Sequence, residues 1–298
     1  MQIIDPRKQR VGMLGMAGIH HGPLASLQNS VVVKYIEADA ARELFEFMDP
    51  ASEVSQTYLA SLGSIMQRGV RVICVGSWID EVVPLYSAVF HGISHPNLYR
   101  AVYIDGPHYR DDFLTNLIIF ALRLRNGGVD DKGLLVHLSN VIVGTLWGST
   151  SGGHSTIYEE KAVYKLALRW LFYSTIVSKP IIISSSLNSP SVIAPIIKTA
   201  QSLLFRVSPD LSALRPCGED GAAESLHIQY RPLNGSDKLN PFYLPWILHS
   251  LWCDSSIKGN PVWRRDIEKL IQLYDEWEPT TKAGKDLKYQ LEAIRLCI

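Results

Sequence analysis

The segment VRVICVGSWID, which spans Val70–Asp80, decides the fold that we predict for this chain. It is rich in β-branched residues and directly follows Gly69, which is typical of a buried strand that begins after a turn. A helix is expected just before it, with Asp49 as the N-cap, Pro50 at the first helical position and Gly69 closing the last turn. The segment therefore predicts one buried strand that the chain enters from a helix.

Two further apolar runs predict the other strands. VGMLGMAGI covers Val11–Ile19 and is bounded by glycine-rich turns, and LYRAVYIDG covers Leu98–Gly106. A short helix is expected to begin near Pro84, between the second and third strands. Because strands that alternate with helices form βαβ units, the sequence predicts an α/β fold with a mostly parallel sheet.

Composition divides the chain into three parts. Residues 1–173 carry the alternating strands and helices. Further helices are predicted there over residues 111–126, 133–146 and 155–173. Residues 174–239 mix Ser, Pro and apolar residues without a period, which predicts an insertion or linker that is partly disordered. Residues 240–298 return to a helical period that is broken at Pro279, so a helical C-terminal segment is expected.

Size and charge narrow the class of protein. The chain has 298 residues, of which 47% are hydrophobic and 19% charged, so a sizeable packed core is expected. Its formal net charge is zero, which predicts no nucleic-acid partner and no overall attraction to anionic lipid. Two small basic clusters, residues 7–10 and 123–125, are interpreted as solvated faces.

No targeting or membrane-spanning segment is recognised. No signal peptide is recognised, and the apolar windows 113–122 and 134–146 are too short to cross a bilayer. The four cysteines show neither CxxC spacing nor a histidine at metal-ligand spacing, and Cys74 is expected to be a buried thiol. No phosphate-binding glycine pattern occurs. We therefore expect an intracellular, cytoplasmic protein with no metal and no cofactor.

Asp80 is the first candidate for chemistry. It follows the strand 70–78, and a parallel sheet presents its reactive groups in the loops at the carboxyl ends of its strands. A carboxylate there can accept a hydrogen bond from a histidine and fix its tautomer. Alternatively, Asp80 only caps the helix that begins near Pro84. The residues by themselves leave both interpretations open.

His154 is the second candidate, in the stretch GGHSTIYEE. Gly152 and Gly153 allow a sharp turn that brings the imidazole out at the tip of a loop, where a general base needs to be. The alternative is a solvent-exposed loop histidine followed by Ser155 as a helix N-cap. The order of Asp80 and then His154 at strand and loop ends favours the catalytic interpretation.

The remaining histidines are weaker candidates. His108 follows the third strand directly and is our second choice for the base. His20 and His21 follow the first strand, where a turn is favoured over a pocket. The pair at 91 and 95 lies in HGISH, one helical turn apart, and no carboxylate or cysteine completes a metal site near it in sequence, so a structural role is expected.

A serine nucleophile is not found at the expected place. The G-x-S-x-G elbow that joins strand to helix in α/β hydrolases does not occur in the sequence. Ser77 lacks the second glycine and lies beside the acid. Ser149 and Ser151 lie on the wrong side of the order Ser, acid, His. The triad predicted from Asp80 and His154 therefore lacks its nucleophile in this chain.

Several long blocks together resemble a fungal family of uncharacterised intracellular α/β-hydrolase-fold proteins, similar to lipases and esterases. These blocks are RVGMLGMAGIHHGPL, VVVKYIEADAARELFEF, VGSWIDEVVPLYSAVFHGISHPNLYRAVYIDG, DFLTNLIIFALRLRNGG and GHSTIYEE. The resemblance covers about Val11–Tyr173, and again the tail from Asn240. It implies that the family's acid falls on Asp80 and its histidine on His154.

The same resemblance implies that the nucleophile belongs to a G-H-S-x-G elbow upstream of the strand 11–19, so this chain is expected to match the C-terminal part of such a domain, as a truncated or degenerate member. We expect a serine ester or lipid hydrolase lineage that is inactive alone, with a small ester or lipid as the substrate of intact members. The alternative is a non-catalytic interaction protein. The first strand is also expected to expose an edge through which the chain self-associates.

Overall fold

A computed structural model of the chain describes residues 11–23, 43–104, 109–142, 153–173, 229–230 and 243–297. The segment expected to be an irregular insertion, 174–239, lies outside these ranges except for residues 229–230. The basic cluster at residues 7–10 and the second-choice base, His108, also lie outside the described residues.

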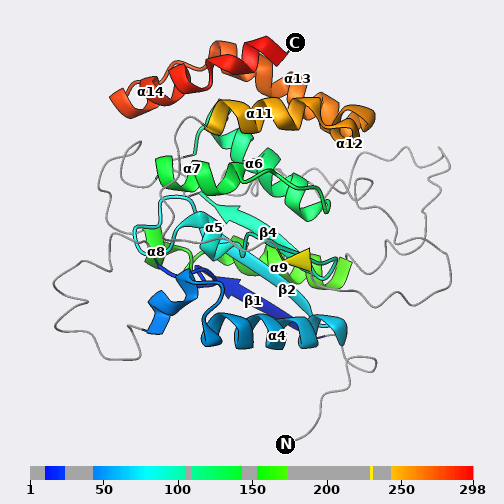
Figure 1. Cartoon of the computed structure of the whole chain (residues 1–298). Coiled ribbons are helices and arrows are strands. Elements are labelled where there is room, and N and C mark those ends of the chain that lie inside the picture. The colour runs from blue at the N-terminus through cyan, green and yellow to red at the C-terminus, as the bar shows by residue number, and fades with distance from the viewer. Residues whose placement is uncertain are drawn as a thin grey trace, which may run out of the picture.

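A parallel sheet of three strands forms the centre of the molecule (Figure 1). The strands β1 (Gly12–Met16), β2 (Arg71–Ser77) and β4 (Leu98–Tyr103) lie in the order β1-β2-β4. Both pairings are parallel, with Met16 beside Val75 in the first. The three predicted strands and their parallel arrangement are therefore confirmed.

Different helices cover the two faces of this sheet, because successive side chains of a strand point to opposite faces. The buried strand residues on the face of α4 (Glu53–Gln67) are Val72, Cys74 and Leu98. Those on the face of α9 (Lys161–Tyr173) are Ile73, Val75, Tyr99, Ala101 and Tyr103. Burial of β2 on both faces explains its unbroken apolar sequence.

The start of α4 differs from the prediction. Its N-cap is Ser52, whose side chain accepts a hydrogen bond from the Ser55 amide at 3.2 Å. Asp49 instead ends the short 3-10 helix η1 (Leu44–Met48) and accepts a bond from the Ala51 amide. The helix therefore begins three residues later than predicted, after Ser52 and not after Asp49. At the other end Gly69 has a φ of +87°, which closes the turn as predicted.

Close packing of the next helix on β2 depends on a glycine. The helix α5 (Leu85–Ala88) begins after Pro84, as predicted, and lies directly against Gly76. A Cβ atom at Gly76 would lie 2.8 Å from carbon atoms of both Leu85 and Ala88. A side chain at this position would therefore push α5 away from the strand.

The C-terminal helices form a further layer beyond α6 (Phe113–Asn126) and α7 (Leu134–Ile142), as Figure 1 shows. They are α11 (Tyr243–Cys253), α12 (Ser255–Gly259), α13 (Pro261–Glu276), α14 (Lys282–Gln290) and the 3-10 helix η4 (Glu292–Cys297). One core cluster joins this layer to α6, where the rings of Phe113 and Tyr274 meet edge to face at 5.1 Å. The break predicted at Pro279 falls between α13 and α14.

The basic cluster at 123–125 is not a solvated face, and that prediction is wrong. Arg125 is only 8% exposed, and its guanidinium donates to the carbonyl of Ile93 in the two-residue strand β3 (Ile93–Ser94). Arg123 forms an ion pair with Asp266 of α13 at 2.7 Å. Both partners lie far away in sequence, so a local charge pattern could not show them. The strand β3 itself pairs antiparallel with β5 (Gln229–Tyr230).

The helix expected over residues 155–173 is divided in two. A short helix, α8 (Gly153–Thr156), carries His154, and α9 begins only at Lys161. The carboxylate of Glu160 accepts a hydrogen bond from the Ala162 amide at 2.8 Å and so caps a new helix start. His154 therefore lies within a single helical turn and not at a loop tip. Among the described helices, none has the length and apolar character needed to cross a bilayer.

Candidate active site

The structure brings Asp80 and His154 together, although 74 residues separate them. Nδ1 of His154 lies 2.8 Å from Oδ2 of Asp80, within hydrogen-bond distance. Asp80 comes from the loop after β2, and His154 comes from α8. The pair therefore lies at the carboxyl end of a strand of the parallel sheet, where the sequence reasoning placed reactive groups.

The carboxylate of Asp80 is fully buried and held by the backbone of its own loop. Its Oδ1 accepts hydrogen bonds from the amides of Val82 at 2.8 Å and Val83 at 2.9 Å. These bonds leave Oδ2 for the imidazole. Asp80 thus shapes the turn that leads to α5 with one oxygen and contacts His154 with the other. The alternative that Asp80 caps α5 is wrong, because the N-cap position of α5 is Pro84.

The His154 side chain is partly open to solvent, with 32% of it exposed, whereas that of Asp80 is 0% exposed. A carboxylate on Nδ1 favours the tautomer that carries its proton there, which leaves Nε2 as an acceptor. No described residue forms a hydrogen bond with Nε2. The arrangement can therefore accept a proton on the exposed side of the ring while a buried negative charge stabilises the resulting cation.

Tyr158 positions α8 against the sheet. Its ring meets the His154 ring edge to face at 5.8 Å, and its hydroxyl lies 3.5 Å from the carbonyl of Met16, at the end of β1. The hydroxyl of Tyr164 donates in turn to the carbonyl of Tyr158 at 2.8 Å. These two hydrogen bonds thus link the turn between α8 and α9 to the end of β1 and to the first residues of α9. Neither tyrosine was singled out in the sequence, where nothing local distinguishes them.

The backbone is strained beside this contact. Ala17 directly follows β1 and has a φ of +47°, a conformation that costs a residue with a Cβ about 1 kcal/mol or more. Its amide donates to the carbonyl of Val75 at 2.8 Å, which continues the sheet pairing by one residue. The strained position therefore marks the point where the chain turns away from the carboxyl end of the sheet.

A second cluster of polar residues is buried on the α4 side of β1. Nδ1 of His20 lies 2.7 Å from the hydroxyl of Tyr58, and the His20 ring stacks on Phe90. The ring of His21 contacts the carbonyl of His91, and its amide donates to Ser87. Burial lowers the pKa of His20 to about 3, so its imidazole is neutral and structural. The turn favoured for His20 and His21 is thus present, but it is buried.

His91 has a carboxylate partner that the sequence analysis missed. Its Nε2 lies 2.8 Å from Oδ1 of Asp131, and both side chains are almost completely buried. Burial by itself would raise the pKa of Asp131, but His91 and Arg125 hold it below its usual range. Within the described residues, no group of three His, Cys, Asp or Glu side chains is placed so that it could hold a metal ion.

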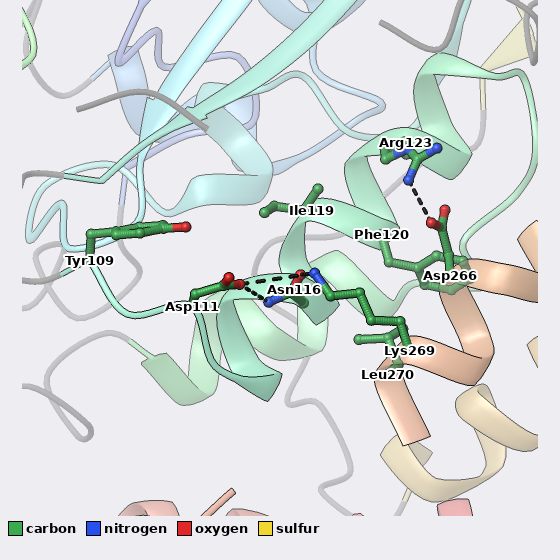
Figure 2. Close-up of a pocket in the computed structure, with 9 residues that line it drawn as sticks. All are labelled: Tyr109, Asp111, Asn116, Ile119, Phe120, Arg123, Asp266, Lys269 and Leu270. Carbon is green, nitrogen blue, oxygen red and sulfur yellow. Dashed lines mark hydrogen bonds and ion pairs between the residues drawn. The ribbon is translucent and has the colours of Figure 1, made fainter. Parts of the chain in front are cut away.

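A cavity of about 210 Å³ lies elsewhere, between α6 and α13 (Figure 2). It is lined by Tyr109, Asp111, Asn116, Ile119, Phe120, Arg123, Asp266, Lys269 and Leu270. Its charges are matched, since Arg123 pairs with Asp266 and the ammonium of Lys269 donates to the side-chain oxygen of Asn116 at 2.7 Å. The cavity contains neither member of the Asp80–His154 pair.

The serines weighed as nucleophiles do not complete the site. Ser149 and Ser151 lie outside the described residues. Ser77 is the last residue of β2 and is 1% exposed. Among the serines that the structure describes, no hydroxyl forms a hydrogen bond with His154. The described site is therefore an oriented histidine with its carboxylate.

Comparison with known proteins gives one match. The family model of the YMC0/YMC35 alpha/beta hydrolase domain matches residues 2–198, which include the whole sheet, Asp80 and His154. No curated protein and no solved structure matches the chain. The match confirms the α/β-hydrolase fold that the sequence blocks predicted, and it extends into the segment beyond residue 173.

Proposed function

This chain belongs to the YMC0/YMC35 alpha/beta hydrolase family, and we propose that His154 and Asp80 are the base and the acid of a serine-hydrolase triad. The observation that carries the proposal is the 2.8 Å contact between Nδ1 of His154 and the buried Oδ2 of Asp80. It unites a general base with its orienting carboxylate at the edge of the sheet where α/β proteins bind their ligands.

Each residue of the pair has a distinct part in this proposal. His154 accepts the proton of the attacking hydroxyl on Nε2 and then returns it to the leaving group. Asp80 keeps the ring in the required tautomer and stabilises the imidazolium as it forms. Its two backbone hydrogen bonds prevent the carboxylate from rotating away from the ring. A small carboxylic ester or a lipid ester is the proposed class of substrate.

We propose that the 298 residues do not turn over an ester through this triad by themselves. A G-x-S-x-G elbow does not occur in the sequence. In a serine hydrolase, loss of the nucleophile lowers kcat by a factor of about 10⁶. The absence of the elbow equally favours a second candidate function, a non-catalytic interaction protein built on the hydrolase scaffold.

The pairing is tested by nitrogen NMR of the His154 imidazole. We expect the tautomer with a proton on Nδ1 in the wild type, and a shift toward the other tautomer in Asp80→Asn. The exposed His249 of α11 serves as an internal control, whose signals should not change. If His154 shows a mixture of tautomers whose proportions are the same in the wild type and in Asp80→Asn, the proposed pair is contradicted.

Turnover is tested separately with short p-nitrophenyl esters. We expect no hydrolysis that depends on His154 when the chain is assayed alone. When a segment that carries a G-H-S-x-G elbow is supplied, hydrolysis should appear and should fall by about 10⁴-fold or more in Asp80→Ala and His154→Ala. Hydrolysis by the chain alone that is lost in His154→Ala would show that it holds its own nucleophile.

We also propose that the chain self-associates along β1. Among the described strands, β1 pairs with β2 alone, and most of its residues are only partly buried. A strand with a free side offers unpaired amides and carbonyls to another chain. Gel filtration over a range of protein concentrations should show a shift toward larger species, and a concentration-independent monomer would refute this.

A further inference from the structure

The outer face of α9 carries positive charge without any negative charge. The helix KAVYKLALRWLFY contains three basic residues and no acidic one. Lys161, Lys165 and Arg169 are all exposed, and they follow one another at intervals of four residues. Side chains four apart lie on the same side of a helix, so the three cations form one stripe along α9.

These cations have no partner among the described residues, unlike many others in the molecule. Arg123 pairs with Asp266, Lys132 with Asp254, and Arg295 with both Asp275 and Glu292. No described carboxylate lies within ion-pair distance of the α9 cations. Glu160, just before the helix, uses its carboxylate to cap the first turn. Among the residues that the structure describes, no carboxylate therefore neutralises the stripe.

Exposed apolar side chains border the same stripe. Leu168 is 54% exposed and Tyr164 is 42% exposed, and they lie four residues apart. The opposite face of α9 packs on the sheet through Val163, with Leu166 and Ala167 partly buried beside it. The outer face thus presents leucine and tyrosine beside lysine and arginine. This combination is typical of helices that lie at a membrane surface, where the cations meet lipid headgroups and the apolar side chains enter the interface.

We propose that this face of α9, defined by Lys161, Tyr164, Lys165, Leu168 and Arg169, binds the surface of an anionic membrane. The chain as a whole is neutral, so the attraction comes from local charge and not from the whole molecule. An acidic protein would satisfy the cations but would give no reason for Leu168 to be exposed among them. The membrane surface accounts for both features.

Docking in this way would bring the Asp80–His154 pair to the lipid. Tyr164 of this face donates to the carbonyl of Tyr158, whose ring lies against His154. The bound face and the candidate site are therefore connected through two consecutive contacts. The membrane-binding proposal does not depend on catalysis, and it can be tested in a chain with no hydrolytic activity.

Cosedimentation with vesicles tests the proposal on the full chain. One set of vesicles holds phosphatidylcholine alone, and the other adds phosphatidylserine. We expect binding to the anionic set only, and loss of most binding as ionic strength rises from about 0.01 M to 1 M, because the Debye length falls from ~30 Å to ~3 Å. No binding to anionic vesicles at low salt would overturn the proposal.

Substitutions locate the surface. The triple variant Lys161→Gln, Lys165→Gln, Arg169→Gln should bind on the order of 100-fold more weakly, since each cation near the surface contributes about fivefold. The matched control Arg265→Gln, Lys282→Gln, Lys285→Gln removes the same charge from exposed positions of the C-terminal helices and should bind as the wild type does. If both triple variants lose vesicle binding equally, binding depends only on the net charge of the chain, and the proposal is overturned.

The apolar part is tested with Leu168→Gln, paired with Tyr289→Gln on α14, where the tyrosine is 83% exposed. We expect Leu168→Gln to bind vesicles several-fold more weakly than the wild type, and Tyr289→Gln to bind them as tightly as the wild type. Polyglutamate serves as a competitor without lipid. If it binds the chain as tightly as the vesicles do and Leu168→Gln has no effect, the face recognises an acidic protein and the membrane proposal fails. All variants should keep the wild-type circular dichroism spectrum and Tm.

Discussion

The described part of the molecule holds two histidine–aspartate pairs with the same separation and opposite surroundings. In each pair a ring nitrogen lies 2.8 Å from a carboxylate oxygen, and in each the carboxylate is buried and also accepts backbone amides. The exposed fraction of the histidine side chain is 32% for His154 but 3% for His91. Of these two histidines, only His154 has the exposed side chain that the proposed base requires. The comparison teaches that distance alone does not separate a candidate catalytic pair from a structural one.

The largest expected effect concerns the buried pair. We expect Asp131→Asn to lower the free energy of unfolding by about 3–5 kcal/mol, because it removes the charged partner of a buried group. His91 and Arg125 would lose a charged partner, and the Leu135 amide would no longer donate to a carboxylate. Urea denaturation followed by circular dichroism measures the change. A loss below about 1 kcal/mol would mean that this pair contributes little to the fold.

Acid should also destabilise the folded chain, through the buried imidazoles of His20 and His21. Burial lowers the pKa of His20 to about 3 and that of His21 to about 4, from 6.5 in the unfolded chain. The unfolded chain then binds more protons between pH 6.5 and 4, so the free energy of unfolding should fall as the pH is lowered through this window. The loss at His21 alone is on the order of 3 kcal/mol.

Denaturation curves at pH 7, 6, 5 and 4.5 measure this dependence. In His21→Gln the free energy of unfolding should change less steeply with pH than in the wild type, whatever the stability of the variant at pH 7. Equal slopes in the wild type and in His21→Gln would show that the buried cluster does not control acid stability.

The smallest effect on stability is expected at the candidate site itself. We expect His154→Gln to change the free energy of unfolding by less than about 1 kcal/mol, since its own side chain is partly exposed and the Asp80 carboxylate keeps its two backbone hydrogen bonds. His154 and His91 should also differ in their reactivity toward diethyl pyrocarbonate, measured by peptide mass spectrometry. His154 should be modified well before His91. Modification of both at the same rate would show that the His91 pair opens to solvent and would remove the distinction.

Local patterns in the sequence were sufficient for the strands and most helices. The β-branched run of β2 and the apolar runs of β1 and β4 lie where they were predicted, because burial on both faces leaves a continuous apolar signal. Errors arose where two local signals competed. Ser52 replaced Asp49 as the cap of α4, and Glu160 began a new helix inside the one expected over 155–173.

For the candidate site, the rule on strand ends and the resemblance to hydrolases identified Asp80 and His154 as a pair, and the structure shows their contact. The role of Tyr158 was not predicted, because its contacts with Met16 and His154 depend on how α8 lies on β1. The partner of His91 was missed for the same reason, since Asp131 lies 40 residues away.

The sequence by itself determined the α/β class, the parallel sheet and the positions of its strands, since these follow from hydrophobic patterns within a few residues of one another. Only the tertiary structure decided which histidine is open to solvent, which is buried against a carboxylate, and which cations lack an ion-pair partner among the described residues. Exposure and pairing depend on residues that are distant in the chain and become neighbours only when the helices pack on the sheet. That packing buries the His91 side chain and leaves the His154 side chain partly exposed.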